Sequence, residues 1–287
     1  MKIRRVSFIL FLAVLVPLLL SLPARAQFRI GFKLYGGYNY LVGGEGNDGV
    51  QGFQDFWVRS GELGGYSASG DYKPFHYGFT GGGDLIFYLT PNIGVSIGAG
   101  YLQASSSSVV NMTRPGVSLA ISSDPKAGAV PLRVGLHLSL PIGASANFVV
   151  NGGAGYYLGT FESRLRLEEG TDWMQWEFEA RGQGIGFHGG AGFELNFGPN
   201  VGLVLEAAGR YARIGGFEGE AKYSMPGFSD SESGKLYFYR MNVALIGTFP
   251  MVFISDTPPS GSGVSDVHEA KIDFSGFSAR AGLIIRF

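Results

Sequence analysis

Alternation of apolar and polar residues with a period of two constrains this chain more than any other feature. Between Ile30 and Tyr40 the even-numbered positions are apolar, aromatic or glycine, and the odd-numbered positions are mostly polar or glycine. The pattern predicts a β-strand with one apolar face, because successive side chains of a strand point to opposite sides. Eight segments show it, namely 30–40, 75–89, 93–101, 130–140, 148–158, 185–197, 201–211 and 277–287.

Composition supports an all-β protein and excludes several functional classes. Glycine accounts for 47 of 287 residues, and 16% of residues are charged, against usual fractions of ~7% and ~25%. The chain has no Cys, which excludes disulfide scaffolds, thiolate metal sites and Cys nucleophiles. The 22 Lys and Arg residues nearly balance the 23 Asp and Glu residues, which argues against a nucleic-acid partner.

The first 26 residues have the pattern of a secretory signal peptide. Three basic residues precede an apolar run that ends at Leu22, and Ala24-Arg25-Ala26 then supplies a small-x-small cleavage pattern. The run is at the short limit for a spanning helix, which favours cleavage over anchoring. We therefore predict a signal peptide over residues 1–26 and one exported domain over residues 27–287.

Connections between the eight segments alternate between short and long. The short ones are 90–92, 141–146 and 198–200, and the long ones are about 43–74, 105–128, 162–182 and 215–271. This alternation predicts a transmembrane, antiparallel, up-and-down β-barrel of eight strands with short periplasmic turns and long extracellular loops. A secreted sandwich or lipocalin-like barrel is the alternative, but aromatic residues at the strand ends favour the membrane. Ten strands also remain open, because the apolar segment 235–255 has room for two short ones.

The last segment carries a family resemblance. Residues 277–287 alternate and end on a phenylalanine, and with the signal peptide and the preceding strands they resemble the OmpA/OmpX/OmpW class of small bacterial outer-membrane barrels. The resemblance implies the outer membrane as the location and the barrel-assembly machinery as a partner. In that class the alternating last strand resembles the assembly signal, which here corresponds to Phe277, Leu283, Ile285 and Phe287.

Charged residues occupy the face of the strands that is predicted to line the barrel interior. They are Lys33, Asp84, Arg133, Glu194, Glu206 and Arg280. An eight-stranded barrel is only wide enough for its own side chains, and buried charges are tolerated when they are paired. We expect one ion-pair network that plugs the lumen, with a gated proton or ion path as the alternative.

Little in the sequence points to catalysis. His137 and Ser139 resemble the His-x-Ser pair of the lipid A deacylases, but they lie on the inner face near the predicted periplasmic turns, whereas that family's pair lies near the outer surface. The segment Gly184–Gly189 matches a dinucleotide pattern but lacks the helix that such a site needs. We expect a protein that is not an enzyme and has no cofactor or metal. Acidic residues in the first and third long loops form either a solvated rim or a site where Ca²⁺ bridges to lipopolysaccharide.

The long loops indicate a function at the cell surface. More than half of the exported chain lies outside the predicted strands, beyond what barrel closure requires. Segment 163–179 predicts a hairpin above the membrane, and segment 235–255 predicts an external hairpin or a lid. Candidate anchors for an extracellular ligand or an apolar small molecule are Trp173, Trp176, Tyr237, Phe238, Phe249 and Phe253. Surface binding or structural anchoring is therefore the expected function. A narrow pore or apolar-solute conduit is the first alternative, and a lipid-modifying enzyme is the second. Outer-membrane lipid and lipopolysaccharide are the expected partners.

Overall fold

The computed structural model describes residues 29–287, so the predicted signal peptide lies outside the described residues. Eight antiparallel strands pair in a closed ring, in the order β1, β3, β4, β6, β7, β8, β9, β14 and back to β1. Their bounds are β1 Arg29–Gly44, β3 Tyr77–Tyr88, β4 Ile93–Ser105, β6 Val117–Pro141, β7 Ala146–Glu169, β8 Asp172–Asn196, β9 Val201–Tyr211 and β14 Ile272–Arg286. The ring confirms the eight predicted strands, and the ten-strand alternative is wrong because the strands of 235–255 lie outside it.

The outer surface of the ring is apolar, as the alternation predicts. Leu34, Ile97, Leu136 and Leu283 are among the large side chains that are about half exposed there. At the end of the ring away from the short turns, the exposed aromatic residues form a belt: Tyr38, Tyr77, Phe79, Tyr101, Tyr156, Phe187, Tyr211 and Phe277. Such belts mark the boundary between the hydrocarbon and the headgroups, so the lipid-facing surface lies between this belt and the short turns.

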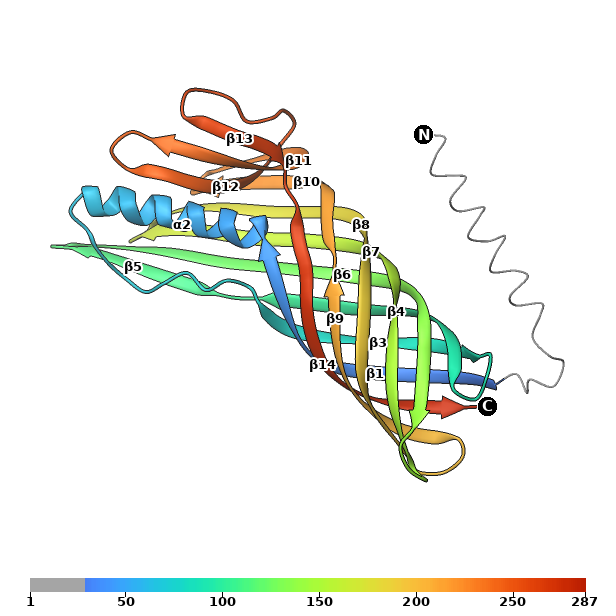
Figure 1. The fold of residues 1–287 in the computed structure, drawn as a ribbon. Helices are drawn as coiled ribbons and strands as arrows, with labels where there is room; N and C mark the ends of the chain where they lie inside the picture. Colours follow the sequence, from blue (N-terminus) through green and yellow to red (C-terminus); the bar gives the residue numbers. More distant parts are fainter. Residues whose placement is uncertain (1–28) are drawn as a thin grey trace, which may run out of the picture.

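Beyond the belt the chain builds a second structure from the long loops (Figure 1). Its elements are α2 Glu45–Leu63, β2 Ser67–Ser69, β5 Ser108–Arg114, β10 Arg213–Met225, β11 Phe228–Val243, β12 Gly247–Ser255 and β13 Val264–Glu269. The long strands β6, β7 and β8 continue out of the barrel and pair onward with β5 and β10 to make a curved wall. The predicted hairpin over 163–179 is confirmed, because β7 and β8 stay paired as far as Glu169 and Asp172.

Helix α2 lies between the two edges of this wall, β12 on one side and β2 with β5 on the other (Figure 1). The long connection predicted over 43–74 contains this helix, which the sequence pattern did not indicate. Gly46, Gly49 and Gly52 lower its helix propensity, but they also permit close packing: a Cβ on Gly52 would lie 1.8 Å from the Pro250 carbonyl oxygen of β12. The helix is thus stabilised by tertiary contact. Within residues 29–287, no helix combines the length and the apolar character needed to cross a membrane.

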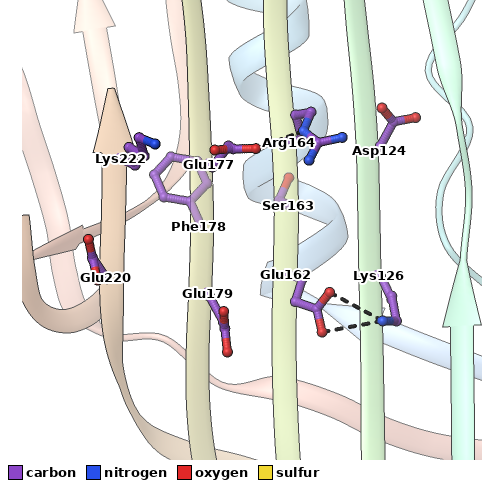
Figure 2. Close-up of a pocket in the computed structure, with 10 residues that line it drawn as sticks. All are labelled: Asp124, Lys126, Glu162, Ser163, Arg164, Glu177, Phe178, Glu179, Glu220 and Lys222. Carbon is purple, nitrogen blue, oxygen red and sulfur yellow. Dashed lines mark hydrogen bonds and ion pairs between the residues drawn. The ribbon is translucent and has the colours of Figure 1, made fainter. Parts of the chain in front are cut away.

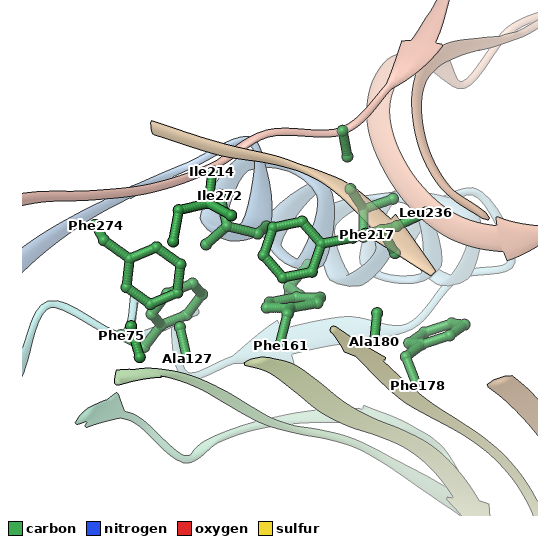
Figure 3. Packing of buried hydrophobic residues seen from close by; sticks show 14 of the residues in the cluster. Phe75, Ala127, Phe161, Phe178, Ala180, Ile214, Phe217, Leu236, Ile272 and Phe274 are labelled. Carbon is green, nitrogen blue, oxygen red and sulfur yellow. The ribbon is translucent and has the colours of Figure 1, made fainter. Parts of the chain in front are cut away.

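An apolar core fills the space where the barrel opens into the extracellular wall (Figure 3). Phe75, Phe161 and Phe274 are completely buried and converge there from different segments. Ile214, Phe217 and Leu236 reach the same core from β10 and β11. Burial of this many large side chains makes the extracellular part a packed extension of the barrel rather than a set of free loops.

Candidate functional site

The lumen of the barrel holds one network of ion pairs. Lys33 Nζ lies 3.1 Å from Asp84 and 3.4 Å from Glu206. Arg133 pairs with Asp84 at 2.9 Å, and Arg280 pairs with Glu206 at 3.4 Å. The register explains the meeting, because Lys33 faces Asp84 across β1 and β3, and Glu206 faces Arg280 across β9 and β14. Five of the six predicted lumen residues therefore come together.

Glu194 does not join this network. It lies nearer the short turns, completely buried, where it pairs with Arg286 and accepts a hydrogen bond from Asn147 Nδ2 at 2.8 Å. The prediction of a single network is wrong for this residue. The sequence does not indicate Arg286 as its partner. The even positions of β14 form its inner face, and they carry residues as different as Ser278, Ile284 and Arg286.

Tyr35 completes the network and was not predicted. Three cations meet only two carboxylates there, and all three lie over the Tyr35 ring: Lys33 at 5.6 Å, Arg133 at 5.3 Å and Arg280 at 4.9 Å. The negative face of an aromatic ring attracts cations, so Tyr35 offsets the missing third carboxylate. The sequence could have indicated Tyr35 as a lumen residue, because it lies two residues after Lys33 and therefore on the same face of the strand.

Apolar layers close the lumen on both sides of the ions. Toward the short turns, Ile86, Val149, Val204 and Ile284 pack together as a buried cluster. Toward the extracellular end lies the large core already described. The space left beside Lys33, Tyr35 and Glu206 is about 10 Å³, no more than one water requires. The interior is therefore closed by side chains at three levels.

His137 and Ser139 are both buried in the lumen near the short turns, with His137 3% exposed. The Tyr88 ring meets the His137 ring edge-on at 6.0 Å. Among the described residues, His137 Nε2 has no hydrogen-bond partner, so it is not poised to take a proton from Ser139. The geometry lacks the base-to-nucleophile contact that such a pair requires.

Five of the six candidate loop anchors pack inside the extracellular part, so for these the role of ligand anchor is wrong. Tyr237, Phe238 and Phe249 are less than 10% exposed. Phe253 packs on the core and on Phe178, with ring centroids 5.2 Å apart. Trp176 packs against Phe53 and Trp57 of α2. These side chains hold the extracellular part together, because α2 and the wall need apolar partners.

Trp173 differs from the other predicted anchors. It is partly exposed near the tip of the β7–β8 hairpin, and the guanidinium of Arg166 lies 4.7 Å from its ring centroid. Among the predicted anchors it is the one at a hairpin tip, so it stays a candidate for contact with a partner.

A charged groove of about 410 Å³ crosses the solvent face of β6, β7, β8 and β10 (Figure 2). Two cross-strand rows line it. One row alternates in sign: Asp124, Arg164, Glu177 and Lys222. The other row is rich in acid: Lys126, Glu162, Glu179 and Glu220. The second row holds three acids and one base, which gives the groove a local excess of negative charge. Adjacent like charges on neighbouring strands are unfavourable for folding.

Several acidic residues of the long loops are paired with bases, which limits the expected calcium or lipopolysaccharide bridge. Glu162 pairs with Lys126 at 3.2 Å, and Glu168 pairs with Arg166. Within residues 29–287, no group of three or more His, Asp or Glu side chains is arranged to hold a metal ion. The acidic rim is therefore in part an arrangement of surface ion pairs, and Asp48, Asp55, Glu169 and Asp172 make no ion pair within residues 29–287.

His268 links β13 to the start of α2. Its Nε2 lies 3.1 Å from Glu45, its Nδ1 lies 3.7 Å from Asp266, and the Phe238 ring lies 5.3 Å from its ring in a tilted arrangement. The hydrogen bond with Glu45 raises the pKa of His268 above its ordinary value, and Asp266 adds to the rise. A raised folded-state pKa means that the stabilisation is present below the unfolded pKa of ~6.5 and is lost as pH rises through the higher folded-state value.

We expect the first turn of α2 to be held more firmly at pH 5.5 than at pH 8.5. Amide hydrogen exchange of residues 45–50 at the two pH values, corrected for intrinsic rates, measures this. His268→Gln should remove the difference. An equal pH effect in the variant would show that another group controls the helix.

Comparison with known proteins agrees with the architecture. A family model described as outer membrane protein beta-barrel domain matches residues 11–225. No curated protein matches the chain. Among solved structures, the outer membrane protease OmpT from Escherichia coli aligns with 94% of this chain and 100% of its own at 9% identity, with a TM-score of 0.30, too low to support an inference about activity. From the family match and the closed ring of lipid-facing strands, the chain belongs to the outer membrane β-barrel family and is located in the bacterial outer membrane.

Proposed function

We propose that the protein is a non-conducting, non-enzymatic outer-membrane anchor that presents a rigid extracellular structure for surface binding or attachment. The closed lumen is the observation that carries the proposal. Three layers of side chains fill it, and each charged group of the middle layer has at least one ion-pair partner. A pore or apolar-solute conduit would need a continuous path, and the packed layers leave about 10 Å³ beside Lys33.

The extracellular part supports the binding half of the proposal. Its core is packed, so the outer face of β6, β7, β8 and β10 is held in one arrangement. A preorganised surface loses little entropy when a partner binds. The groove of Figure 2 lies on this face, and its acid-rich row favours a partner with positively charged groups.

The proposal that the protein is not an enzyme rests on the burial and the contacts of His137. This imidazole is buried, lacks a hydrogen bond to Ser139 and lies at the periplasmic end of the lumen, remote from the outer leaflet. An outer-surface lipid hydrolase needs a nucleophile, a base and an oriented carboxylate within reach of its substrate.

We expect the refolded protein to show no steady conductance in a planar lipid bilayer. Arg133→Ala removes one ionic contact of the middle layer, and replacement of residues 45–63 by a short glycine linker removes α2 from the apolar layer. Because the three layers close the lumen in series, each change alone and the two together should leave the protein silent, and conduction should appear only when Ile86→Ala also opens the apolar layer toward the short turns. Arg164→Ala on the outer face is the matched control.

Steady single-channel current from the natural sequence would contradict this proposal. It would show that the packed layers open in the bilayer, and the pore alternative would then replace the anchor.

A further inference from the structure

A shallow hollow lies on the lipid-facing side of β1, β14 and β9, separate from the lumen and from the charged groove. It encloses about 360 Å³, and its floor is made by small residues that include Ala207, Gly209 and Ala279. Ala207 and Ala279 face each other across β9 and β14, and both are exposed. Small side chains at this position leave a depression between larger apolar groups. A second hollow, of about 980 Å³, lies on the lipid-facing side over Gly83, Ala99 and Ala154.

Aromatic rings bound the hollow at its extracellular end. Tyr40 stacks on Phe277 with ring centroids 5.2 Å apart and on His76 at 5.0 Å. Tyr38 stacks on Tyr77 at 6.0 Å. The hydroxyl groups of Tyr38, Tyr40 and Tyr77 make no hydrogen bond with any other residue of 29–287. The hollow is thus apolar at its base and offers free donors at the level of the aromatic belt.

Two cations lie beyond the rings toward the extracellular side. Arg213 is two residues after Tyr211, which places it about 7 Å farther along the chain, and its guanidinium lies 5.8 Å from the Tyr211 ring. Lys271 is exposed, and its side chain packs beside Gly215 of β10.

The acids near these cations are paired. Asp273 pairs with Arg213 at 3.1 Å, but the aspartate side chain is 10% exposed and the arginine 60%. Glu45 accepts a hydrogen bond from the Lys271 backbone N–H and is also committed to His268. Arg213 is thus paired with Asp273, the exposed Glu269 pairs with Lys235, and Lys271 is the cation of this group whose ammonium makes no ion pair within residues 29–287.

We propose that this hollow binds one molecule of a phosphorylated, acylated lipid of the outer leaflet, of the lipid A type. An acyl chain occupies the depression over Ala207 and Ala279, the sugar lies against the ring stack, and a phosphate contacts Lys271 and Arg213. The order of apolar floor, aromatic rings and cations matches the order of chain, sugar and phosphate in such a lipid. Charge-assisted contacts to phosphate are among the strong hydrogen bonds, and the positive charge of Lys271 complements the anionic head.

Native mass spectrometry of the full-length mature protein in detergent, titrated with purified lipid A, tests the proposal. We expect one tightly retained lipid, with affinity reduced about tenfold by Lys271→Gln through loss of the phosphate contact. Ala207→Phe fills the hollow and should reduce retention by a similar factor. The matched controls are Arg181→Gln, an exposed cation 77% accessible on another strand, and Ala99→Phe, an exposed alanine of β4; both should retain the lipid.

Two outcomes would overturn the proposal. Equal losses in the test and control variants would show general electrostatic or surface association. Unchanged retention of dephosphorylated lipid A would show that the cations do not contact a phosphate. A titration with phosphatidylglycerol distinguishes lipid A from another phosphate-bearing lipid. If phosphatidylglycerol is retained as tightly as lipid A, the assignment to lipid A is contradicted. The result is independent of the conductance test, because the hollow is outside the barrel.

Discussion

Glu206→Leu is expected to lower the free energy of unfolding by about 3–5 kcal/mol, the usual cost of breaking a buried ion pair by removing one partner. Glu206 is 7% exposed and binds Lys33, Arg280 and Asn151 Nδ2, the last at 2.7 Å. Without its carboxylate, three cations share the single charge of Asp84. Equilibrium urea unfolding in detergent micelles, followed by Trp fluorescence and gel mobility, measures the loss.

Two further variants make this result specific to the lumen charge. Glu206→Gln keeps a side-chain oxygen for Asn151 but loses the charge, so its cost should be intermediate. Arg164→Leu breaks an outer pair with Glu177 in which the arginine is 57% exposed, and the expected cost there is about 0–1 kcal/mol. Equal costs for Glu206→Leu and Arg164→Leu would show that the lumen pairs are hydrated and add little.

Phe161→Ala is expected to destabilise the extracellular part by about 3–5 kcal/mol, the range for removal of a buried phenylalanine. Phe161 is completely buried, its ring lies 6.0 Å from that of Phe75, and it touches the first turn of α2 at Gly46. The cavity would lie where the helix, the barrel mouth and the curved wall meet (Figure 3). Loss of packing there should release α2 before the barrel unfolds.

Limited proteolysis of the refolded protein measures this local effect. Cleavage within residues 45–75 should become faster, while the barrel keeps its heat-dependent gel mobility. Phe228→Ala is the control, because Phe228 is 48% exposed at the β10–β11 turn. If Phe161→Ala changes proteolysis no more than the control does, the core of Figure 3 does not hold the helix.

The barrel was predictable because its signal is local. Alternation over residues such as 30–40 and 201–211 reports which face of a strand meets lipid, and this needs no knowledge of distant residues. The pairing of Lys33 with Asp84 and of Glu206 with Arg280 was accessible for the same reason, since strand order and equal depth bring inner-face charges together. Glu194 lies nearer the short turns than the other lumen charges, and the expectation of one network was wrong for it because Arg286, at the same end of β14, is its partner.

The extracellular part was less predictable because long-range contact decides it. Helix α2 contains Gly46, Gly49 and Gly52, which local propensity counts against a helix. Close packing favours them, because Gly49 and Gly52 lie against Val252 and Pro250, and Gly46 lies against the core at Phe161. Trp176, Tyr237 and Phe249 were interpreted as surface anchors because each lies in a long loop. They are core residues because the loops fold together.

The sequence by itself therefore determined the eight lipid-facing strands, their antiparallel order, the side with short turns and most of the ions in the lumen. Each of these follows from a repeat of two residues and from the length of the connections. Only the tertiary structure decided that the long loops form a packed extension with α2 between its edges, that Tyr35 balances the lumen charge, and that cations lie above an aromatic stack on the outer surface. The physical reason is that these features depend on side chains from segments far apart in the chain, whose contacts leave no periodic pattern in any one of them.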